Sequence, residues 1–538
     1  MNNTSMTPRA AASTERLAFN CGGGSVPGQR TIDDAMARDD KPTFATAAYA
    51  EPRDWGYLGL IGFTAVLLLR PQDHLPGLAS LHLAEVCALL GIGPMLFHRF
   101  NKRLPLFRIT AETAGLLFLG LVILATVPFS IWPGGALEVF SDSYLKTVVV
   151  FVLMVNTLTT PKRLEQLTWL IVCCCGYIAF RACLDYATGV SLVEGGRVAG
   201  SVGGIFGNPN DLALNMVTFT PAAFMVAFTR SHSQLRRLAA AGIAALMLAT
   251  VVFTKSRGGA LGMGAMLLAV LYFGRKVRPG FTVMALIAVL VTAPLLPASF
   301  WSRMATIGSE EQDKVEYTGS SEARRVVMQE GIDTFLEFPF TGVGAGQFKN
   351  YNPPSRKERW RETHNALIQI ASETGIFGLL AFAFLIVRGG VAAAVTQRQL
   401  TPPRKSTGSD PLALVMSDDE RRSLYAYMAA LSAGLLGWFV CSLFASVAYS
   451  WTFYYLLALI VATRELVRVR LSVAKRFLTS EVTATSVPRG TGFAAEGDRG
   501  DVGGPGPADP MRHIGCSTGN EGINRTSHAT GERRHTRV

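Results

Sequence analysis

The most regular feature of the sequence is an alternation between long apolar runs and short polar segments. The apolar runs are about 17–25 residues long, the length that a helix needs to cross roughly 30 Å of hydrocarbon. They lie at roughly 54–70, 79–98, 111–131, 143–159, 165–186, 208–229, 237–254, 258–274, 280–300, 364–388, 424–446 and 451–468. The pattern predicts an all-α polytopic membrane protein with about 12 transmembrane helices.

Three longer polar stretches interrupt this alternation. Residues 1–53 and 469–538 are rich in small and polar residues, which predicts disordered extensions before the first span and after the last one. Residues 301–363 form one long polar loop of partly helical character between the ninth and tenth spans. The loop therefore separates two blocks of predicted transmembrane helices, residues 54–300 and residues 364–468.

The distribution of positive charge predicts how the chain is oriented. The sequence has 51 Lys and Arg against 39 Asp and Glu, a net charge of +12. The positive residues gather in the segments that follow the even-numbered spans, which is typical of cytoplasmic loops. Both termini are therefore expected in the cytoplasm, and the long loop on the outer face. Because the positive charge is dispersed among loops, no nucleic-acid partner is expected.

Two outer turns carry polar groups that a lipid-spanning bundle does not require. In the first, Arg197 precedes a turn rich in glycine and asparagine, where Asn210 is either a helix cap or a ligand-binding group. In the second, Arg257 lies in a tight outer turn, although positively charged residues usually gather in cytoplasmic loops. Such an arginine either reaches out to lipid headgroups or belongs to a functional site.

The long loop supplies the remaining candidates. Arg324 and Arg325 begin a segment with helical spacing of apolar residues, and the arginine fork suits phosphate oxygens, although paired arginines also occur on solvated helices. His364 and Asn365 lie at the mouth of the tenth span, where a histidine exchanges a proton near neutral pH or holds a loop carbonyl. Together, Arg197, Arg257 and Arg324 predict an anionic ligand, a diphosphate. No residue cluster has metal-ligand spacing, so neither a metal nor a cofactor is expected.

The order and spacing of these motifs resemble the O-antigen ligase and O-antigen polymerase-like family of bacterial inner-membrane glycosyltransferases. The resemblance is carried by Arg197…Gly207-Asn208-Pro209-Asn210, by Ser256-Arg257-Gly258, by the Arg324 segment leading to Pro339…Gly342-Val343-Gly344, and by His364-Asn365 followed by Gly375 and Gly378. These motifs extend over residues 197–378, and the layout of the spans extends the resemblance to residues 54–468.

The resemblance implies a metal-independent glycosyltransferase in the bilayer of the bacterial inner membrane, with its active site facing the periplasm. The implied donor is a glycan linked to undecaprenyl diphosphate, and the implied acceptor is a hydroxyl of lipid A–core, of another glycan or of a protein. His364, Arg257 and Arg324 would be catalytic. The groups expected to bind the diphosphate or the acceptor are Arg197, Arg325, Asn365 and Asn210.

Other functions remain open at this point. A repeat-unit polymerase of exopolysaccharide or O-antigen, or a protein O-oligosaccharyltransferase, would use the same chemistry as a ligase. A transporter of lipid-linked glycans would favour charges at mid-membrane and paired broken helices, whereas the candidates here gather at one surface. A scaffold for envelope assembly would have no reason to place a histidine where the loop meets a span.

Overall fold

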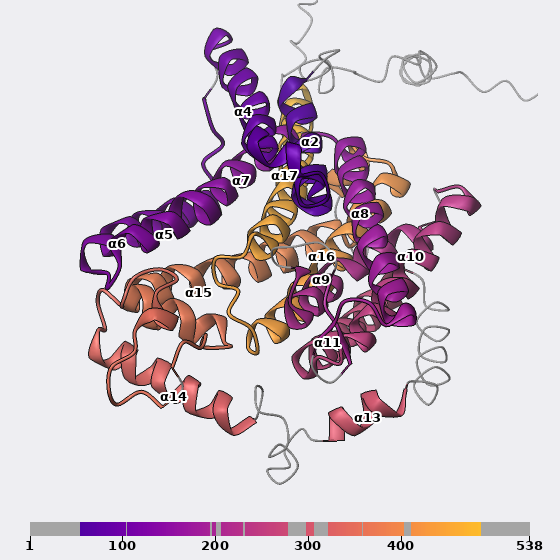
Figure 1. The fold of residues 1–538 in the computed structure, drawn as a ribbon. Coiled ribbons are helices and arrows are strands. Elements are labelled where there is room, and N and C mark those ends of the chain that lie inside the picture. Colours follow the sequence, from indigo (N-terminus) through magenta and orange to yellow (C-terminus); the bar gives the residue numbers. More distant parts are fainter. Residues whose placement is uncertain are drawn as a thin grey trace, which may run out of the picture. The chain divides into compact units, whose positions relative to one another are not determined.

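The computed structural model describes residues 54–103, 105–193, 196–200, 206–229, 232–277, 297–305, 321–357, 359–402 and 410–485. These residues are almost entirely helical (Figure 1). The chain divides into two units, residues 1–481 and residues 482–538. The fold of the first unit follows, and the described part of the second is the end of one helix.

The described elements are helices, with one small hairpin. The first are α2 (Trp55–Leu69), α3 (Pro71–His74), η2 (Pro76–Leu81), α4 (Leu83–Asn101), α5 (Ala111–Thr126), η3 (Val127–Phe129), α6 (Pro133–Glu138), the π-helical η4 (Val139–Leu145), α7 (Lys146–Thr157) and α8 (Pro161–Thr188). The antiparallel β1 (Leu192–Val193) and β2 (Arg197–Val198) precede α9 (Pro209–Phe228), α10 (Gln234–Phe253) and α11 (Arg257–Val277). The last are α13 (Ala298–Ala305), α14 (Ser321–Glu337), η8 (Phe348–Asn350), α15 (Ala366–Leu400), η9 (Pro411–Leu414), α16 (Asp418–Ser442) and α17 (Trp451–Thr485).

The predicted class of all-α polytopic membrane protein is confirmed. Within the described part of the chain, eight helices are long and apolar enough to cross a membrane. A helix also occupies each predicted span that falls there, including the shorter ones at α2 and α7. The predicted span at 280–300 lies mostly outside the described residues, so the count of twelve stays a prediction.

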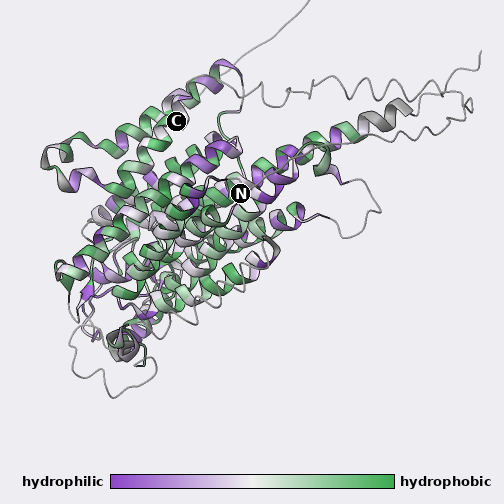
Figure 2. Ribbon diagram, turned by 90° about the vertical axis from the view of Figure 1, so that its right-hand side faces the viewer, coloured by the Kyte–Doolittle hydropathy of each residue, from purple (hydrophilic) through white to green (hydrophobic). Residues whose placement is uncertain are grey.

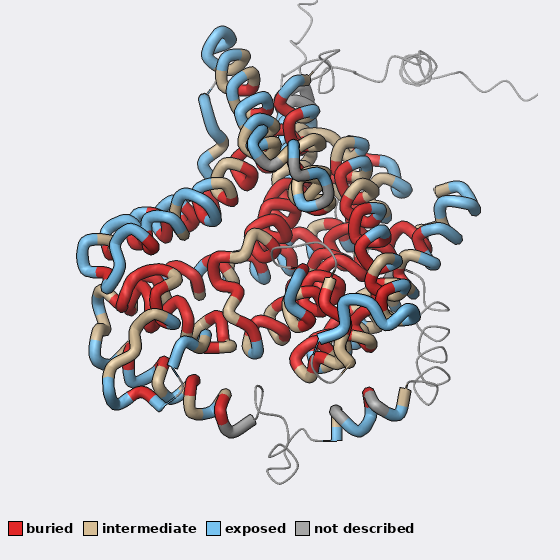
Figure 3. The backbone as a smooth tube through the Cα atoms, viewed as in Figure 1, coloured by how far each residue is buried: buried red, intermediate tan, exposed pale blue. Residues whose placement is uncertain are grey.

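The most buried helices are α9 and α16, which pack against each other and against α11. Buried residues make up 83% of the spanning window of α9 and 72% of that of α16, but only 11% of that of α4 (Figure 3). Apolar residues also cover helix surfaces that no other helix touches, such as Leu89 and Phe97 on α4 (Figure 2). Such faces are stable against lipid and costly in water.

Small residues allow the central helices to approach closely. A Cβ added at Gly262 of α11 would lie 2.1 Å from Cys441 Sγ of α16, and one added at Gly434 of α16 would lie 2.4 Å from the Thr218 carbonyl oxygen of α9. Helices in a membrane gain stability mainly from such close packing, because lipid removes the usual hydrophobic driving force between them.

A buried ion cluster joins three helices that are far apart in the sequence. Glu112 of α5 is fully buried, and both its oxygens accept hydrogen bonds of 2.8 Å from Arg464 of α17. Arg388 of α15 lies 2.9 Å from the same carboxylate. Because an unpaired charge is costly in a protein interior, the cluster fixes these helices together.

The prediction that disorder begins at residue 469 is wrong for the first part of the tail. Helix α17 continues to Thr485, so residues 469–485 are helical. Val467 and Ala474 are both fully buried, and their spacing of two helical turns keeps one apolar face in contact with the bundle. The remaining tail residues and residues 1–53 lie outside the described part of the chain.

Candidate active site

Arg197 joins two of the predicted polar turns into one cluster. Its Nε donates to the Thr254 carbonyl over 3.0 Å, and its Nη2 donates to Asn210 Oδ1 over 2.8 Å. Ser256 Oγ donates to the same Asn210 oxygen over 2.9 Å. Asn208, and not Asn210, caps α9, because Asn208 Oδ1 accepts from the backbone at position 210. Asn210 is therefore available to connect the two predicted turns.

The turn before α11 is held tightly against its neighbours, and Arg257 is the first residue of that helix. A Cβ added at Gly258 would lie 2.7 Å from Phe444 Cβ, and one added at Gly259 would lie 2.6 Å from Ala213 Cβ. The two glycines are thus required by close packing. They fix the backbone that carries Arg257, whose side chain is half-buried.

His364 lies at the junction between the long loop and α15, in a left-handed conformation with φ 52°. Its backbone N–H donates to Ser446 Oγ over 2.9 Å. Burial, together with the positive charges of Arg324 and Arg361, lowers the pKa of the imidazole to about 4. His364 is therefore neutral at neutral pH, the form that can accept a proton, and two arginines act on it electrostatically.

The structure distinguishes the other three candidates of this region by their surroundings. On α14, Arg324 is half-buried and acts on His364, whereas Arg325 is exposed. Asn365 caps α15, because its Oδ1 accepts from Leu367 N at 2.9 Å and Ile368 N at 3.1 Å. These contacts give Asn365 a structural role, and its contact with substrate stays a prediction.

One short turn between α16 and α17 connects the two clusters. The Leu443 carbonyl accepts from Asn365 Nδ2 over 3.2 Å, and Ser446 Oγ accepts from His364 N. Phe444, between them, is the side chain packed on Gly258. The start of α11 and the start of α15 therefore lie against the same few residues, which brings Arg257 and His364 to one region of the molecule.

The glycine-rich stretch of the loop is docked on a break in α15. Gly375 has φ 68° and ψ −165°, which interrupts the helix. The buried Glu373 beside it accepts from the backbone N–H groups of Gly346 at 2.8 Å and Phe348 at 3.3 Å. Residues 342–346 thus bind protein carbonyls and carboxylates through their backbone, as expected for a packing turn and not for a nucleotide loop.

Several polar residues of this region were missed or undervalued in the sequence. Glu362 is an exposed residue, but desolvation by the surrounding protein raises the pKa of its carboxyl group. The positive charge of Lys349 lowers that pKa in part. Glu362 also acts electrostatically on Asp211 of α9. The charged cluster at 356–362 was visible in the sequence, whereas Ser446 carries no sequence signal. Among the described residues, no group of three or more His, Cys, Asp or Glu is arranged to hold a metal ion.

The fold and the site define a multi-pass helical membrane protein with a cationic polar site at the helix ends. The family model for O-antigen ligase matches residues 242–383, which include Arg257, Arg324 and His364. This match supports an O-antigen ligase-like family and a role in membrane glycan transfer for polysaccharide biosynthesis. A search of curated proteins found no match.

Proposed function

We propose that the protein transfers a glycan from undecaprenyl diphosphate to an acceptor hydroxyl on the periplasmic face of the bacterial inner membrane. The observation that carries this proposal is the pairing of a neutral, half-buried His364 with Arg324 at the end of a membrane-spanning helix. A proton acceptor and fixed cations are the two groups that transfer from a diphosphate requires.

In the proposed reaction the acceptor oxygen attacks the anomeric carbon of the donor sugar. The bond between that carbon and the diphosphate oxygen breaks, and its electron pair remains on the diphosphate. His364 takes the proton of the acceptor hydroxyl, and Arg257 and Arg324 stabilise the charge that develops on the phosphate oxygens. Arg197 supports the floor of the site through Asn210 and the Thr254 carbonyl. The products are the lengthened acceptor, a proton and undecaprenyl diphosphate.

The break in α15 also bears on the transporter alternative. Discontinuous helices in transporters expose backbone groups that bind the cargo. Here the break at Gly375 is filled by the protein's own loop, because Glu373 and the Ser372 carbonyl are bound by backbone N–H groups of residues 343–348. This use of the break favours an enzyme, with the loop as a fixed part of the site. Ligase, polymerase and protein oligosaccharyltransferase remain alternatives within the same chemistry.

The test is glycan transfer by full-length protein in liposomes that contain the host's lipid-linked glycan. We expect His364→Ala to lower the rate by ~10²–10⁴-fold, the usual contribution of a placed base. Arg257→Ala and Arg324→Ala should each lower it by ~10²–10³-fold. Gln329→Ala, an exposed change on the same α14 helix, is the matched control.

Transfer at the wild-type rate by all three variants would refute the proposed site. Chelation with EDTA tests the proposed metal independence, and it should leave the rate unchanged. Arg325→Ala shows which of the two adjacent arginines contacts the diphosphate. A loss of transfer rate equal to that of Arg324→Ala would assign the contact to the exposed Arg325.

A further inference from the structure

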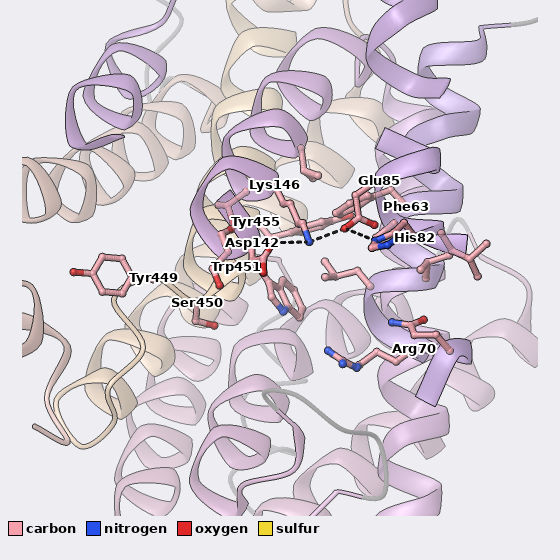
Figure 4. A pocket seen from close by; sticks show the side chains of 18 of the residues that line it. Phe63, Arg70, His82, Glu85, Asp142, Lys146, Tyr449, Ser450, Trp451 and Tyr455 are labelled. Atoms are coloured by element: carbon pink, nitrogen blue, oxygen red, sulfur yellow. Dashed lines mark hydrogen bonds and ion pairs between the residues drawn. The ribbon is translucent and has the colours of Figure 1, made fainter. Parts of the chain in front are cut away.

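A cavity of about 580 Å³, part of whose lining is drawn in Figure 4, was not anticipated from the sequence. Its walls come from α2, α4, η4, α7 and residues 449–455, with Phe206 and Asp211 completing the lining. The volume falls within the range of roughly 300–1,000 Å³ that is usual for ligand pockets. None of the catalytic arginines lines this cavity.

The charges of the cavity are paired with one another. Lys146 Nζ lies 2.7 Å from a Glu85 carboxylate oxygen and 3.7 Å from one of Asp142, as the dashed lines in Figure 4 show. Arg70 is bound by Asp73 at 2.6 Å. The lining holds the cations Arg70 and Lys146 against three carboxylates, those of Glu85, Asp142 and Asp211. Such a lining does not favour a diphosphate, in contrast to the arginines around His364.

The uncharged part of the lining is amphipathic. Trp451, Tyr455 and Phe63 present aromatic faces, while Ser143 and Ser450 add hydroxyl groups close to the paired charges. A sugar ring matches this combination, since its C–H face packs on aromatic rings and its hydroxyl groups exchange hydrogen bonds with carboxylates and hydroxyls. Polar groups placed among apolar walls are also what fixes the orientation of a bound small molecule.

The cavity shares two chain segments with the candidate active site. Tyr449 and Ser450 line the cavity and belong to the same turn as Ser446, whose Oγ accepts from the backbone N–H of His364. Asp211 also lines the cavity, and it follows Asn210, which binds Arg197. A ligand in the cavity therefore contacts segments that also hold the candidate site. We propose that the cavity binds a neutral, hydroxyl-rich saccharide, either of the acceptor or of the donor glycan. This inference rests on the proposed function and adds a second binding region to it.

The test uses purified full-length protein in lipid nanodiscs and follows the fluorescence of Trp451, with Trp451→Phe to identify its signal. The probes are oligosaccharide released from the host's lipid-linked donor, oligosaccharide released from its surface acceptor, and inorganic pyrophosphate. Ser143→Phe fills the cavity from η4, and Ser450→Phe fills it from residues 449–455, without adding a tryptophan. Ser141→Phe is the matched control, because Ser141 is an exposed residue of the same π-helix that does not line the cavity.

We expect both filling variants to weaken binding of one oligosaccharide by about tenfold or more, equivalent to ~1.4 kcal/mol. The affinity for pyrophosphate should stay within about twofold of the wild-type value. The oligosaccharide affected assigns the cavity to donor or acceptor. Unchanged saccharide binding in both variants, or a loss of pyrophosphate binding instead, would overturn the inference. Failure of the proposed function is recognised separately, as normal glycan transfer by His364→Ala and Arg257→Ala.

Discussion

Arg356 is a buried cation that holds the second half of the long loop in shape. The residue is 6% exposed, and its guanidinium donates to the backbone carbonyls of Phe348 at 2.6 Å, Arg361 at 2.8 Å and Tyr351. It also lies 3.4 Å from the carboxylate of Glu330 on α14. One side chain thus ties the segment that precedes His364 to the helix that carries Arg324.

We expect Arg356→Ala to release this segment while the helical bundle stays folded. Removing one partner of a buried charge pair costs about 3–5 kcal/mol, because Glu330 loses its counter-ion and the backbone carbonyls lose their donor. Since 1.4 kcal/mol is about tenfold, the population of the open loop should rise by roughly a hundredfold to a few thousandfold. Glycan transfer should fall as well, because the released segment positions His364.

Chymotrypsin cleavage after Trp360, a residue that is 71% exposed in this loop, measures the opening directly in nanodiscs. Lys357→Ala is the control, since it removes an adjacent exposed cation. Arg356→Lys should give an intermediate rate, because lysine keeps the charge but loses the planar fork. A cleavage rate for Arg356→Ala equal to that of the wild type would refute this account of the loop.

Three further changes test other parts of the structure. Because the pKa of His364 is lowered to about 4, the transfer rate should stay level from roughly pH 8 to 5 and fall near pH 4 in a pH–rate profile. Arg361→Gln removes one of the charges that lower this pKa, so it should move the fall in rate to higher pH. The same histidine should make the fold less stable as pH falls from 6.5 towards 4, since only the unfolded chain binds the proton there. Gly375→Ala should destabilise the protein by at least ~1–3 kcal/mol in thermal unfolding, because φ is 68° and the new Cβ would lie 2.6 Å from the Phe340 carbonyl. Glu112→Ala should cost about 3–5 kcal/mol in the same assay, more than Glu112→Gln, because it removes the shared carboxylate of the half-buried Arg388 and leaves the buried Arg464 with Glu465 alone.

The spans and their polar ends could be predicted from the sequence because hydrocarbon thickness imposes a length on every crossing helix. The presence of a helix at Arg324, which begins at Ser321, and the position of His364 before α15 followed from local pattern in the same way. These features depend on residues that are near one another in the chain. A simple count of apolar residues therefore reaches them without knowledge of the packing.

The cavity and the docking of the loop could not be predicted in this way. Lys146 meets Glu85 only because α4 and α7 pack with particular faces together, and apolar runs do not specify helix rotation in a membrane. The break at Gly375 shows the same limit. The glycine was visible, but the sequence gives no sign that Glu373 next to it binds the backbone of residues 346 and 348.

The two clusters of the candidate site depend on a turn that carries no charge. Leu443, Phe444 and Ser446 contact the starts of both α15 and α11 through a carbonyl, a ring and a hydroxyl. Because α11 and α15 are separated by the whole long loop in sequence, their relative position is fixed by this turn and by the packing of α16 against both helices. The relative position of Arg257 and His364 is thus set by neutral packing.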